Sequence, residues 1–232
     1  IIGLRYVMPK VDGPSLEGVE PAEGLTASVL IIGFGRFGQI ASQPLLARHH
    51  SVSIIDNDPE MIRAAAQIGF KVYYGDGTRL DILHAAGAAT ADVILVCTDV
   101  KEQTTRIAEL LRDQFPLARV MARAYDRGHA IELVKAGVDY QVRELFESAV
   151  AFGGEAIRRL GASDEEAAEV VDGVRSRDRQ RFELQLAGED WRSLGRLLLS
   201  NAEDQARESG MPPRSTDSPR DTDPAGAPGT PP

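Results

Sequence analysis

The chain has 232 residues and a formal net charge of −9. This charge argues against a nucleic-acid partner, because nucleic acids usually bind to a basic face. The single cysteine, Cys97, excludes a disulfide within the chain and fits a reducing compartment. The four histidines show no ligand spacing, so no structural metal site is expected. No stretch approaches the roughly 18–20 apolar residues of a membrane span.

The N-terminal residues support two interpretations equally. The chain opens on Ile1-Ile2-Gly3-Leu4, without an initiator methionine, and an aromatic and basic stretch follows to Lys10. This order is typical of the end of an apolar segment with an interfacial flank. A tag remnant or an ordinary N-terminal strand is equally compatible with this composition. Residues 9–27 are rich in Pro, Gly and Glu without a hydrophobic period, which predicts a solvated linker.

The stretch from Ser28 to Asp58 has the order strand, glycine-rich turn, helix, strand, acidic residue, which is the dinucleotide-binding fingerprint. Gly33 allows the tight turn, Gly35 lets the backbone approach a phosphate, and Gly38 permits close packing of helix on strand. A helix that starts near Arg36 directs its unpaired N–H groups and the positive end of its dipole at that phosphate.

The acidic end of this fingerprint favours particular nucleotides. Asp56 follows Gly33 by 23 residues, at a distance along the chain where a carboxylate accepts hydrogen bonds from both ribose hydroxyls. Asn57 and Asp58 lie beside it, and no Arg or Lys does. A 2′-phosphate would be repelled there. We therefore expect NAD(H), AMP or another adenosine nucleotide rather than NADP.

Short β-branched runs alternate with helical patterns along the next hundred residues. Asp58 is a candidate N-cap, with Pro59 at the first helical position. Six strands with intervening helices predict a doubly wound parallel sheet, a Rossmann domain of the α/β class, over residues 28–143. After the first strand and helix, the predicted strands are 51–56, 71–74, 92–97, 119–124 and 139–142, and the predicted helices 59–68, 79–86, 101–114 and 127–136.

A helical segment over residues 144–204 is expected after the sheet, with a disordered tail over 205–232 that is too poor in apolar groups to offset its ordering entropy. Residues 144–160 form an amphipathic helix, and Ser163 opens a capping box for a second helix that runs to the region of Arg175. Residues 182–186 are a short strand or the next helix, and residues 191–199 are helical. The first helix carries its apolar residues on one stripe: Leu145, Ala149, Phe152, Ala156 and Leu160.

Ligands of a doubly wound sheet lie beyond the carboxyl ends of its strands. Asp76 and Thr78 can hydrogen-bond an adenine, or Thr78 can cap the next helix; Arg36 can reach a phosphate. Arg123, at a strand end, serves a ligand or an interface ion pair. The candidate nucleotide-binding residues are Gly33, Phe34, Gly35, Arg36, Phe37, Gly38, Asp56, Asn57, Asp58, Asp76, Gly77, Thr78, Arg79, Thr98 and Asp99.

The sequence favours a sensor over an enzyme. It shows no evident catalytic His-Asp pair, nucleophile elbow or Walker lysine. The one Tyr-x-x-x-Lys spacing, Tyr6 to Lys10, precedes the fingerprint and contains Pro9, so it is not on a helix beside a cofactor. Too little chain follows the sheet for a substrate domain.

Five segments of the chain closely resemble the cytoplasmic KTN (RCK) domain of bacterial glutathione-gated potassium efflux systems, KefB/KefC. The pieces GFGRFGQ and YGD-x-TR are specific to that group within the Rossmann folds. The resemblance covers roughly residues 28–160, and more weakly the helices to about residue 186. The segments are VLIIGFGRFGQ at 29–39, IDNDPE at 55–60, VYYGDGTRLDIL at 72–83, AGA at 86–88 and MARAYD at 121–126.

The resemblance implies a homodimeric regulatory domain on the cytoplasmic face of the bacterial inner membrane, joined through residues 1–27 to a preceding potassium/proton antiporter. It implies AMP or NAD(H) at the glycine-rich loop and glutathione or its adducts as effector at Arg123, near the dimer interface. The helix after the sixth strand would cross to the partner protomer. An ancillary oxidoreductase subunit is a further implied partner.

The sequence also allows alternative interpretations of one segment and of the function. The arginine-rich stretch 175–181 departs from the family pattern; it would bind an anionic peptide, or it is a solvated helix face. A small NAD-dependent oxidoreductase is an alternative function. An NADH-sensing subunit of a Trk-type potassium uptake system is another, although such proteins usually repeat the domain.

Overall fold

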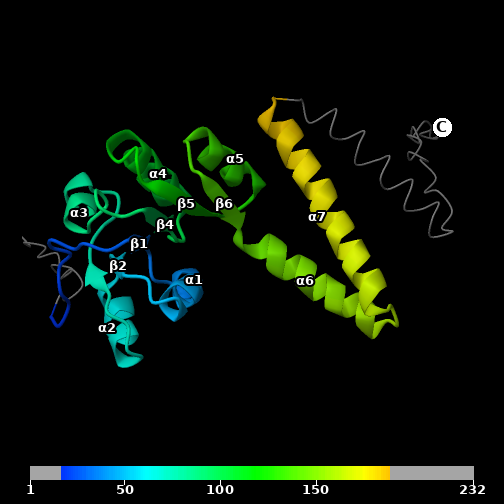
Figure 1. Ribbon diagram of the computed structural model, residues 1–232, viewed down its shortest axis with the longest axis horizontal. Coiled ribbons are helices and arrows are strands. Elements are labelled where there is room, and N and C mark those ends of the chain that lie inside the picture. Colours follow the sequence, from blue (N-terminus) through cyan, green and yellow to red (C-terminus); the bar gives the residue numbers. More distant parts are fainter. Residues whose placement is uncertain (1–16, 189–232) are drawn as a thin grey trace, which may run out of the picture. The chain divides into compact units, whose positions relative to one another are not determined.

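Six parallel strands form one sheet in the order β3-β2-β1-β4-β5-β6 within the part of the chain that the structure, a computed structural model, describes, residues 17–188 (Figure 1). Among the described residues, those from 17 to 182 belong to one compact unit and those from 183 to 188 to a second. The strands are β1 (Val29–Ile32), β2 (Val52–Asp56), β3 (Tyr73–Tyr74), β4 (Val93–Val96), β5 (Arg119–Ala124) and β6 (Tyr140–Arg143).

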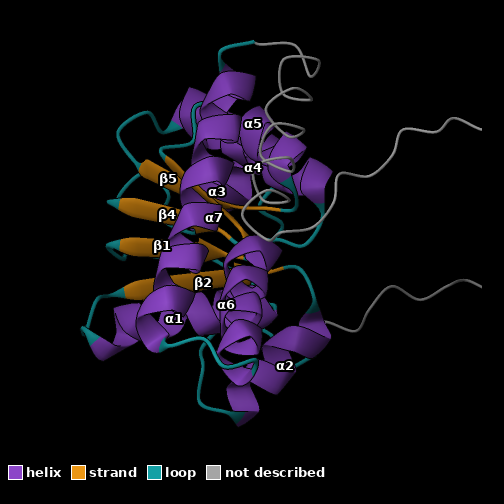
Figure 2. Cartoon of the chain, turned by 90° about the vertical axis from the view of Figure 1, so that its right-hand side faces the viewer, coloured by secondary structure: helices purple, strands orange, loops and turns teal. Residues whose placement is uncertain are grey.

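The strand order reverses at β1, because β2 and β4 both pair with it. Ile32 at its end is in register with Ile55 of β2 and Val96 of β4. Figure 2 shows β5, β4, β1 and β2 side by side in this order. The loops after β1, β2 and β4 therefore meet at one edge of the sheet, which is the switch point where doubly wound sheets bind ligands. The predicted doubly wound parallel sheet is confirmed.

Helices cover both faces of the sheet, and side chains alternate between two apolar clusters. Leu30 and Ile32 of β1 face the cluster that contains residues of α3, α4 and α5, whereas Val29 and Ile31 face the cluster with α2. The five helices between the strands are α1 (Arg36–Ala47), α2 (Pro59–Gln67), α3 (Leu80–Ala85), α4 (Lys101–Gln114) and α5 (Arg127–Lys135).

The two central strands, β1 and β4, consist only of apolar residues, as expected for a parallel sheet covered on both faces. All four residues of β1 are buried, and Ile55 and Ile94 on the neighbouring strands are fully buried. Burial of one such side chain contributes about 1.5–3 kcal/mol, as an upper estimate. The apolar runs read from the sequence thus form the interior.

The predicted element boundaries agree with the structure for α4 and β5 and lie within one or two residues elsewhere between residues 28 and 143. Asp58 caps α2 through its side chain, which accepts a hydrogen bond from the Glu60 N–H, and Pro59 is the first helical residue. The edge strand β3 is shorter than predicted, because only Tyr73 and Tyr74 pair with β2.

The segment that precedes the sheet is attached to it, so the predicted solvated linker is wrong for residues 20–25. Pro21 forms a parallel bridge with Tyr74. The Ala22 N–H donates to the Tyr74 carbonyl at 3.0 Å, and the Leu25 N–H donates to the Ala85 carbonyl at 3.0 Å. Ala22 is 3% exposed. The unpaired backbone groups of an edge strand attract such a segment. Residues 1–16 lie outside the described part.

Two further helices follow the sheet, α6 (Glu144–Arg159) and α7 (Asp164–Leu186). The predicted capping box is confirmed: the Ser163 N–H donates to the Glu166 carboxylate, and the Glu166 N–H donates to Ser163 Oγ. The predicted end of the second helix near Arg175 is wrong, and of the two alternatives for residues 182–186 the strand is wrong. Helix α7 continues through both positions. The predictions for residues 191–199 and 205–232 lie outside the described part.

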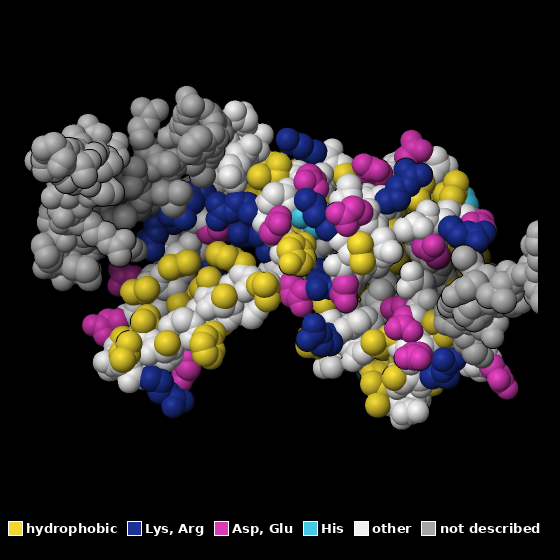
Figure 3. Space-filling view, turned by 180° about the vertical axis from the view of Figure 1, so that it is seen from behind, with side chains coloured by type: hydrophobic (Ala, Val, Ile, Leu, Met, Phe, Trp, Pro, Cys, Tyr) yellow, Lys and Arg dark blue, Asp and Glu magenta, His cyan; other side chains and the backbone are white. Residues whose placement is uncertain are grey.

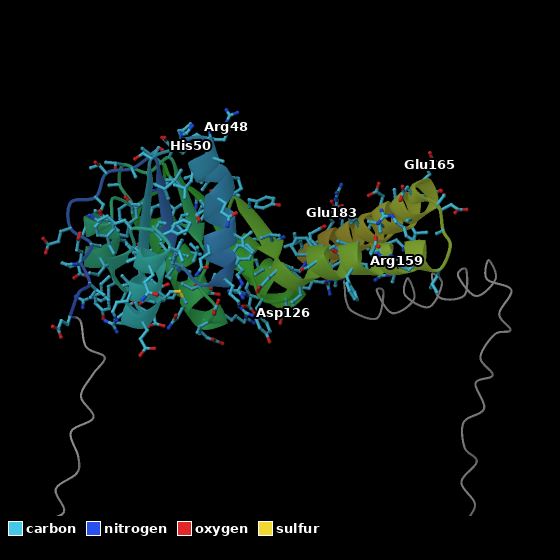
Figure 4. The ribbon with its side chains drawn as sticks, turned by 90° about the horizontal axis from the view of Figure 1, so that it is seen from below. Arg48, His50, Asp126, Arg159, Glu165 and Glu183 are labelled. Atoms are coloured by element: carbon cyan, nitrogen blue, oxygen red, sulfur yellow. The ribbon has the colours of Figure 1, made fainter. Side chains whose placement is uncertain are left out.

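Helices α6 and α7 form an antiparallel hairpin, which we call the α6–α7 hairpin. Arg159 and Glu165 mark its turn (Figure 4). Gly154 allows the close approach, because a Cβ there would lie 2.8 Å from Val171 Cγ2. At the base of the hairpin, Asp178 of α7 is buried and forms ion pairs with Arg127 of α5 and Arg143 at the end of β6.

Candidate nucleotide-binding site

A cavity of about 230 Å³ lies at the carboxyl ends of β1, β2, β3 and β4. The strand-end rule predicted its position, and the loops that line it are those singled out in the sequence. Among the described residues that line it there is no lysine, arginine or histidine. The predicted residues that line the cavity are Gly33, Gly35, Asp56, Asn57, Asp58, Asp76, Gly77, Thr78, Thr98 and Asp99.

Glycines are required in the turn between β1 and α1. Gly33 has a φ of 93°, and a Cβ on it would lie 2.9 Å from the Thr98 backbone nitrogen. A Cβ on Gly38 would lie 2.2 Å from the Gly33 carbonyl oxygen. Such contacts force the backbone to shift. The roles predicted for Gly33 in the turn and for Gly38 in helix packing are therefore confirmed.

The first turn of α1 faces the cavity, and no acidic side chain of α1 itself neutralises this helix end. Gly35 is the N-cap residue, so no side chain caps the helix, and the first turn contains no acidic residue. The unpaired N–H groups and the positive end of the helix dipole are free to bind an anion. Gly35 lines the cavity, so a phosphate can approach these groups closely.

Asp56 ties the glycine turn to the end of β2. Its Oδ2 accepts a hydrogen bond of 2.6 Å from the Phe34 N–H, and its Oδ1 accepts one of 2.8 Å from the Asp58 N–H. Each carboxylate oxygen still has a further lone pair for a ribose hydroxyl. The carboxylate therefore holds the turn in place and lines the cavity at the same time. The sequence indicated only the second role.

The loop after β3 is ordered by its own side chains. Asp76 Oδ1 accepts hydrogen bonds from the Thr78 N–H at 2.9 Å and from Thr78 Oγ1 at 2.7 Å. The N-cap of α3 is Arg79, without a side-chain cap, so the alternative that Thr78 caps this helix is wrong. Arg79 is exposed and forms an ion pair of 2.7 Å with Asp81. A Cβ on Gly77 would lie 2.5 Å from Ile32 Cγ2.

The loop after β4 closes the cavity on its other side. Thr98 Oγ1 lies 2.7 Å from Thr104 Oγ1 of α4, a hydrogen bond that fixes the loop on the helix. Cys97, the preceding residue, is buried, and burial raises the pKa of its thiol to about 12. The thiol is therefore protonated at neutral pH and is not a nucleophile.

Five of the candidate nucleotide-binding residues, and the candidate effector residue Arg123, do not line this cavity. Phe34 is fully buried, with its ring 5.0 Å from that of Phe70, and contributes its N–H to Asp56. Arg36 is the exposed first residue of α1. The other four are Phe37, Gly38, Arg79 and Arg123.

Sequence reasoning missed Met61, Val100, Gln103 and Ile107, which also line the cavity. Gln103 and Ile107 are one turn apart on α4, so the i, i+4 spacing after the Thr98-Asp99 loop was the available signal. Met61 of α2 accepts a hydrogen bond from Gln39 of α1 at 3.4 Å.

Arg123 lies beside a second, larger cavity of about 490 Å³ between α1 and the adjoining face of β4, β5 and β6. Its side chain is 11% exposed and forms ion pairs with Asp99 and with Glu144, the first residue of α6. The guanidinium lies over the Phe37 ring, 5.5 Å from its centroid. Both ion pairs lie within the chain, so the predicted role of Arg123 at a ligand or at an interface ion pair stays a prediction.

Between residues 17 and 188, no three His, Cys, Asp or Glu side chains are grouped closely enough to hold a metal ion. Over the same range, no helix combines the length and the apolar composition that a membrane span requires.

The chain is similar in sequence to proteins named for potassium efflux. The chain matches the TrkA-N domain family over residues 29–144. It is 44% identical over 158 residues to a glutathione-regulated potassium-efflux system protein of Haemophilus influenzae, a match over 68% of this chain and 26% of that protein. It is 36% identical over 189 residues to the efflux protein KefC of Escherichia coli, over 80% of this chain and 30% of that one.

A solved structure agrees with these relatives. The C-terminal domain of Kef from Shewanella denitrificans, in an AMP-bound form, superposes with a TM-score of 0.64 at 36% identity, over 70% of this chain and 99% of that one. The chain spans only about a quarter to a third of the length of the curated relatives. The chain therefore belongs to the TrkA-N domain family, as a KTN (RCK) domain of the KefB/KefC type.

Proposed function

We propose that this chain is a ligand-sensing regulatory domain that binds AMP or NAD(H) in the cavity at the switch point of its sheet. The observation that carries the proposal is the pairing, across one cavity, of the uncapped N-terminus of α1 with the Asp56 carboxylate. The helix end binds phosphate and the carboxylate binds ribose hydroxyls. The AMP in the Kef domain of Shewanella denitrificans supports the same assignment here.

The size and charge of the cavity favour a small nucleotide without a 2′-phosphate. Its volume of about 230 Å³ is below the roughly 300–1,000 Å³ of pockets for drug-sized ligands, which fits AMP or one half of NAD(H). The carboxylates of Asp56 and Asp58 line it and repel a 2′-phosphate. Phosphate contacts would come from backbone N–H groups, since the cavity lining described here includes no cationic side chain.

We further propose that the domain is a homodimer that associates through α6. The predicted apolar stripe of this helix is exposed: Leu145 is 71%, Phe152 81% and Leu160 86% exposed. Figure 3 shows hydrophobic side chains gathered along this helix. Large exposed apolar faces of this kind mark interaction sites. A second copy of the chain offers the same stripe and would cover it in a two-fold arrangement.

The output that we propose is control of potassium efflux by an attached membrane antiporter, with the domain on the cytoplasmic face of the bacterial inner membrane. The names of the curated relatives support this output, and also glutathione or its adducts as effector. Arg123 is the proposed effector residue because it contacts the first residue of α6, the helix of the proposed interface. An effector can shift an equilibrium between two conformations of the domain only if it binds the two with different affinities.

Nucleotide binding is tested by calorimetric titration of the full chain with AMP, NADH and NADPH. We expect AMP or NADH to bind and NADPH to bind at least about tenfold more weakly. Asp56→Asn should reduce this discrimination, since it removes one of the two carboxylate charges that repel the 2′-phosphate. Asp92→Asn is the matched control, because Asp92 lies at the opposite end of β4 and does not line this cavity. Binding of none of the three nucleotides would refute the proposal.

The enzyme alternative is separated from the regulatory one by a second assay. An oxidoreductase would consume NADH with some acceptor, and we expect no turnover from the isolated chain. In the whole transport protein, Arg123→Ala should alter potassium efflux in response to glutathione adducts. Unchanged gating in that variant would remove Arg123 from the proposed mechanism.

A further inference from the structure

Asp99 stands out among the residues that line the nucleotide cavity, because its charge faces the phosphate end. A methyl group placed on Gly35 would lie 3.7 and 3.8 Å from the two carboxylate oxygens of Asp99. Gly35 is the N-cap of α1, next to the N–H groups that would bind a phosphate. The carboxylate therefore lies next to the space that such a phosphate requires.

Arg123 holds the Asp99 carboxylate in this position. The Asp99 side chain is 72% exposed and shows an ion pair with Arg123, whose own side chain is largely buried. The same guanidinium pairs with Glu144 through its other terminal nitrogen. A chain of charge contacts thus runs from the phosphate end of the cavity, through one arginine, to the first residue of α6.

We propose that Asp99 is an internal competitor of the nucleotide phosphate, and that phosphate binding moves its carboxylate away from Gly35 and breaks its ion pair with Arg123. This inference rests on the proposed function. Asp99 then lowers the affinity for phosphate-bearing nucleotides. Its displacement leaves Arg123 paired with Glu144 alone.

The physical reason is repulsion between like charges at short range. A phosphate that accepts hydrogen bonds at the N-terminus of α1 and a carboxylate beside Gly35 are two anions only a few ångströms apart, and water screens them incompletely in a cavity. Movement of Asp99 relieves the repulsion, and its exposure leaves room for that movement. Adenosine has no phosphate, so it binds without this cost. The predicted effect is therefore specific to the phosphate and not to the base or ribose.

The direct test is calorimetric titration of the full chain with AMP and with adenosine. We expect Asp99→Asn to raise the ratio of the AMP affinity to the adenosine affinity by about tenfold or more. The control Asp92→Asn removes the same charge at the other end of β4 and should change neither affinity. Asn fits the exposed position of Asp99, so the variant should fold.

The outcomes separate this inference from the proposed function. If AMP binds the wild-type chain and Asp99→Asn leaves this ratio unchanged, as it would if the variant lost affinity for AMP and adenosine alike, the competition by Asp99 is wrong and nucleotide binding stands. If neither chain binds AMP, adenosine or NADH, the proposed function fails and this inference fails with it.

The link to α6 is tested by NMR of the Arg123 Nε–H group, assigned with Arg123→Lys. We expect AMP to shift this resonance in the wild-type chain and adenosine not to shift it. In Asp99→Asn the resonance should be displaced before any nucleotide is added. An Arg123 signal that AMP leaves in place would overturn the proposed exchange of partners.

Discussion

The sheet region, residues 29–143, and the α6–α7 hairpin are held together by different forces. The sheet buries continuous apolar strands under helices on both faces. The hairpin leaves its apolar stripe exposed and contacts the sheet region through the ion pairs of Asp178 with Arg127 and Arg143 and through Phe182, which packs against the core. The first region buries its apolar residues within the chain, whereas the second leaves Leu145, Phe152 and Leu160 exposed. The regulatory function proposed above uses both regions, the sheet for ligand binding and the exposed stripe of α6 for association.

The same substitution, Phe to Ala, should change the free energy of unfolding by very different amounts in the two regions. Phe34→Ala removes a fully buried ring and should lower the free energy of unfolding by about 3–5 kcal/mol. Phe152→Ala removes an exposed ring and should change it by no more than about 0.5 kcal/mol in dilute solution. Urea denaturation measures both. Equal losses would show that α6 is packed within the monomer.

The attachment of the hairpin depends on one buried carboxylate. Asp178→Ala leaves two arginines without their partner and should cost about 1–3 kcal/mol. Hydrogen exchange should rise in α7 and not in β1. Asp172→Ala, on the same helix, removes an exposed partner of Arg175 and should cost about 0.5 kcal/mol or less. If the two variants behave alike, Asp178 does not anchor the hairpin.

Two glycines in helices should respond in opposite directions to alanine. Gly38→Ala places a Cβ against the Gly33 carbonyl and should destabilise the chain by about 1–3 kcal/mol, with weaker AMP binding. Gly153→Ala meets no atom within 4 Å in α6 and should stabilise it by about 0.5–1 kcal/mol. Thermal unfolding with and without AMP measures both. A stabilising Gly38→Ala would contradict the close packing.

A smaller loss of stability than at Phe34, Asp178 or Gly38 is expected at the turn of the hairpin. Ser163→Ala removes the cap of α7 and should cost about 1 kcal/mol. The Ser163 N–H holds the pKa of Glu166 below its usual value of 4.5. A lowered folded-state pKa stabilises the chain above that value, and this part is lost as the pH falls through the folded-state pKa. Helicity measured between pH 7 and pH 3 checks the sign.

The sheet could be predicted from the sequence because local patterns determine it. Apolar runs such as Val29–Ile32 have no stable place except the interior, and the order of strands and helices leaves few topologies. The same holds for the position of the cavity, because the carboxyl ends of parallel strands share one edge. The roles of Gly33 and Gly38 could also be predicted, because their spacing after the first strand is a local pattern.

The remaining features depend on side chains that meet across large sequence separations. The ion pairs of Arg123 with Asp99 and Glu144 join residues 24 and 21 positions apart, and no pattern near any of them indicates the contact. The continuation of α7 past Arg175 was missed because its charged sequence shows little periodicity. The attachment of residues 20–25 to β3 was missed because backbone hydrogen bonds to an edge strand require no particular side chain.

The most direct test of the account is mass spectrometry of the ligand released when the purified chain is denatured, after incubation with AMP and NADH and removal of excess nucleotide. The account predicts an adenine nucleotide in about equimolar amount to the wild-type chain. The same nucleotide should be depleted in Gly35→Val, in which a branched side chain fills the space beside α1. A chain that releases no nucleotide under these conditions would contradict the central claim.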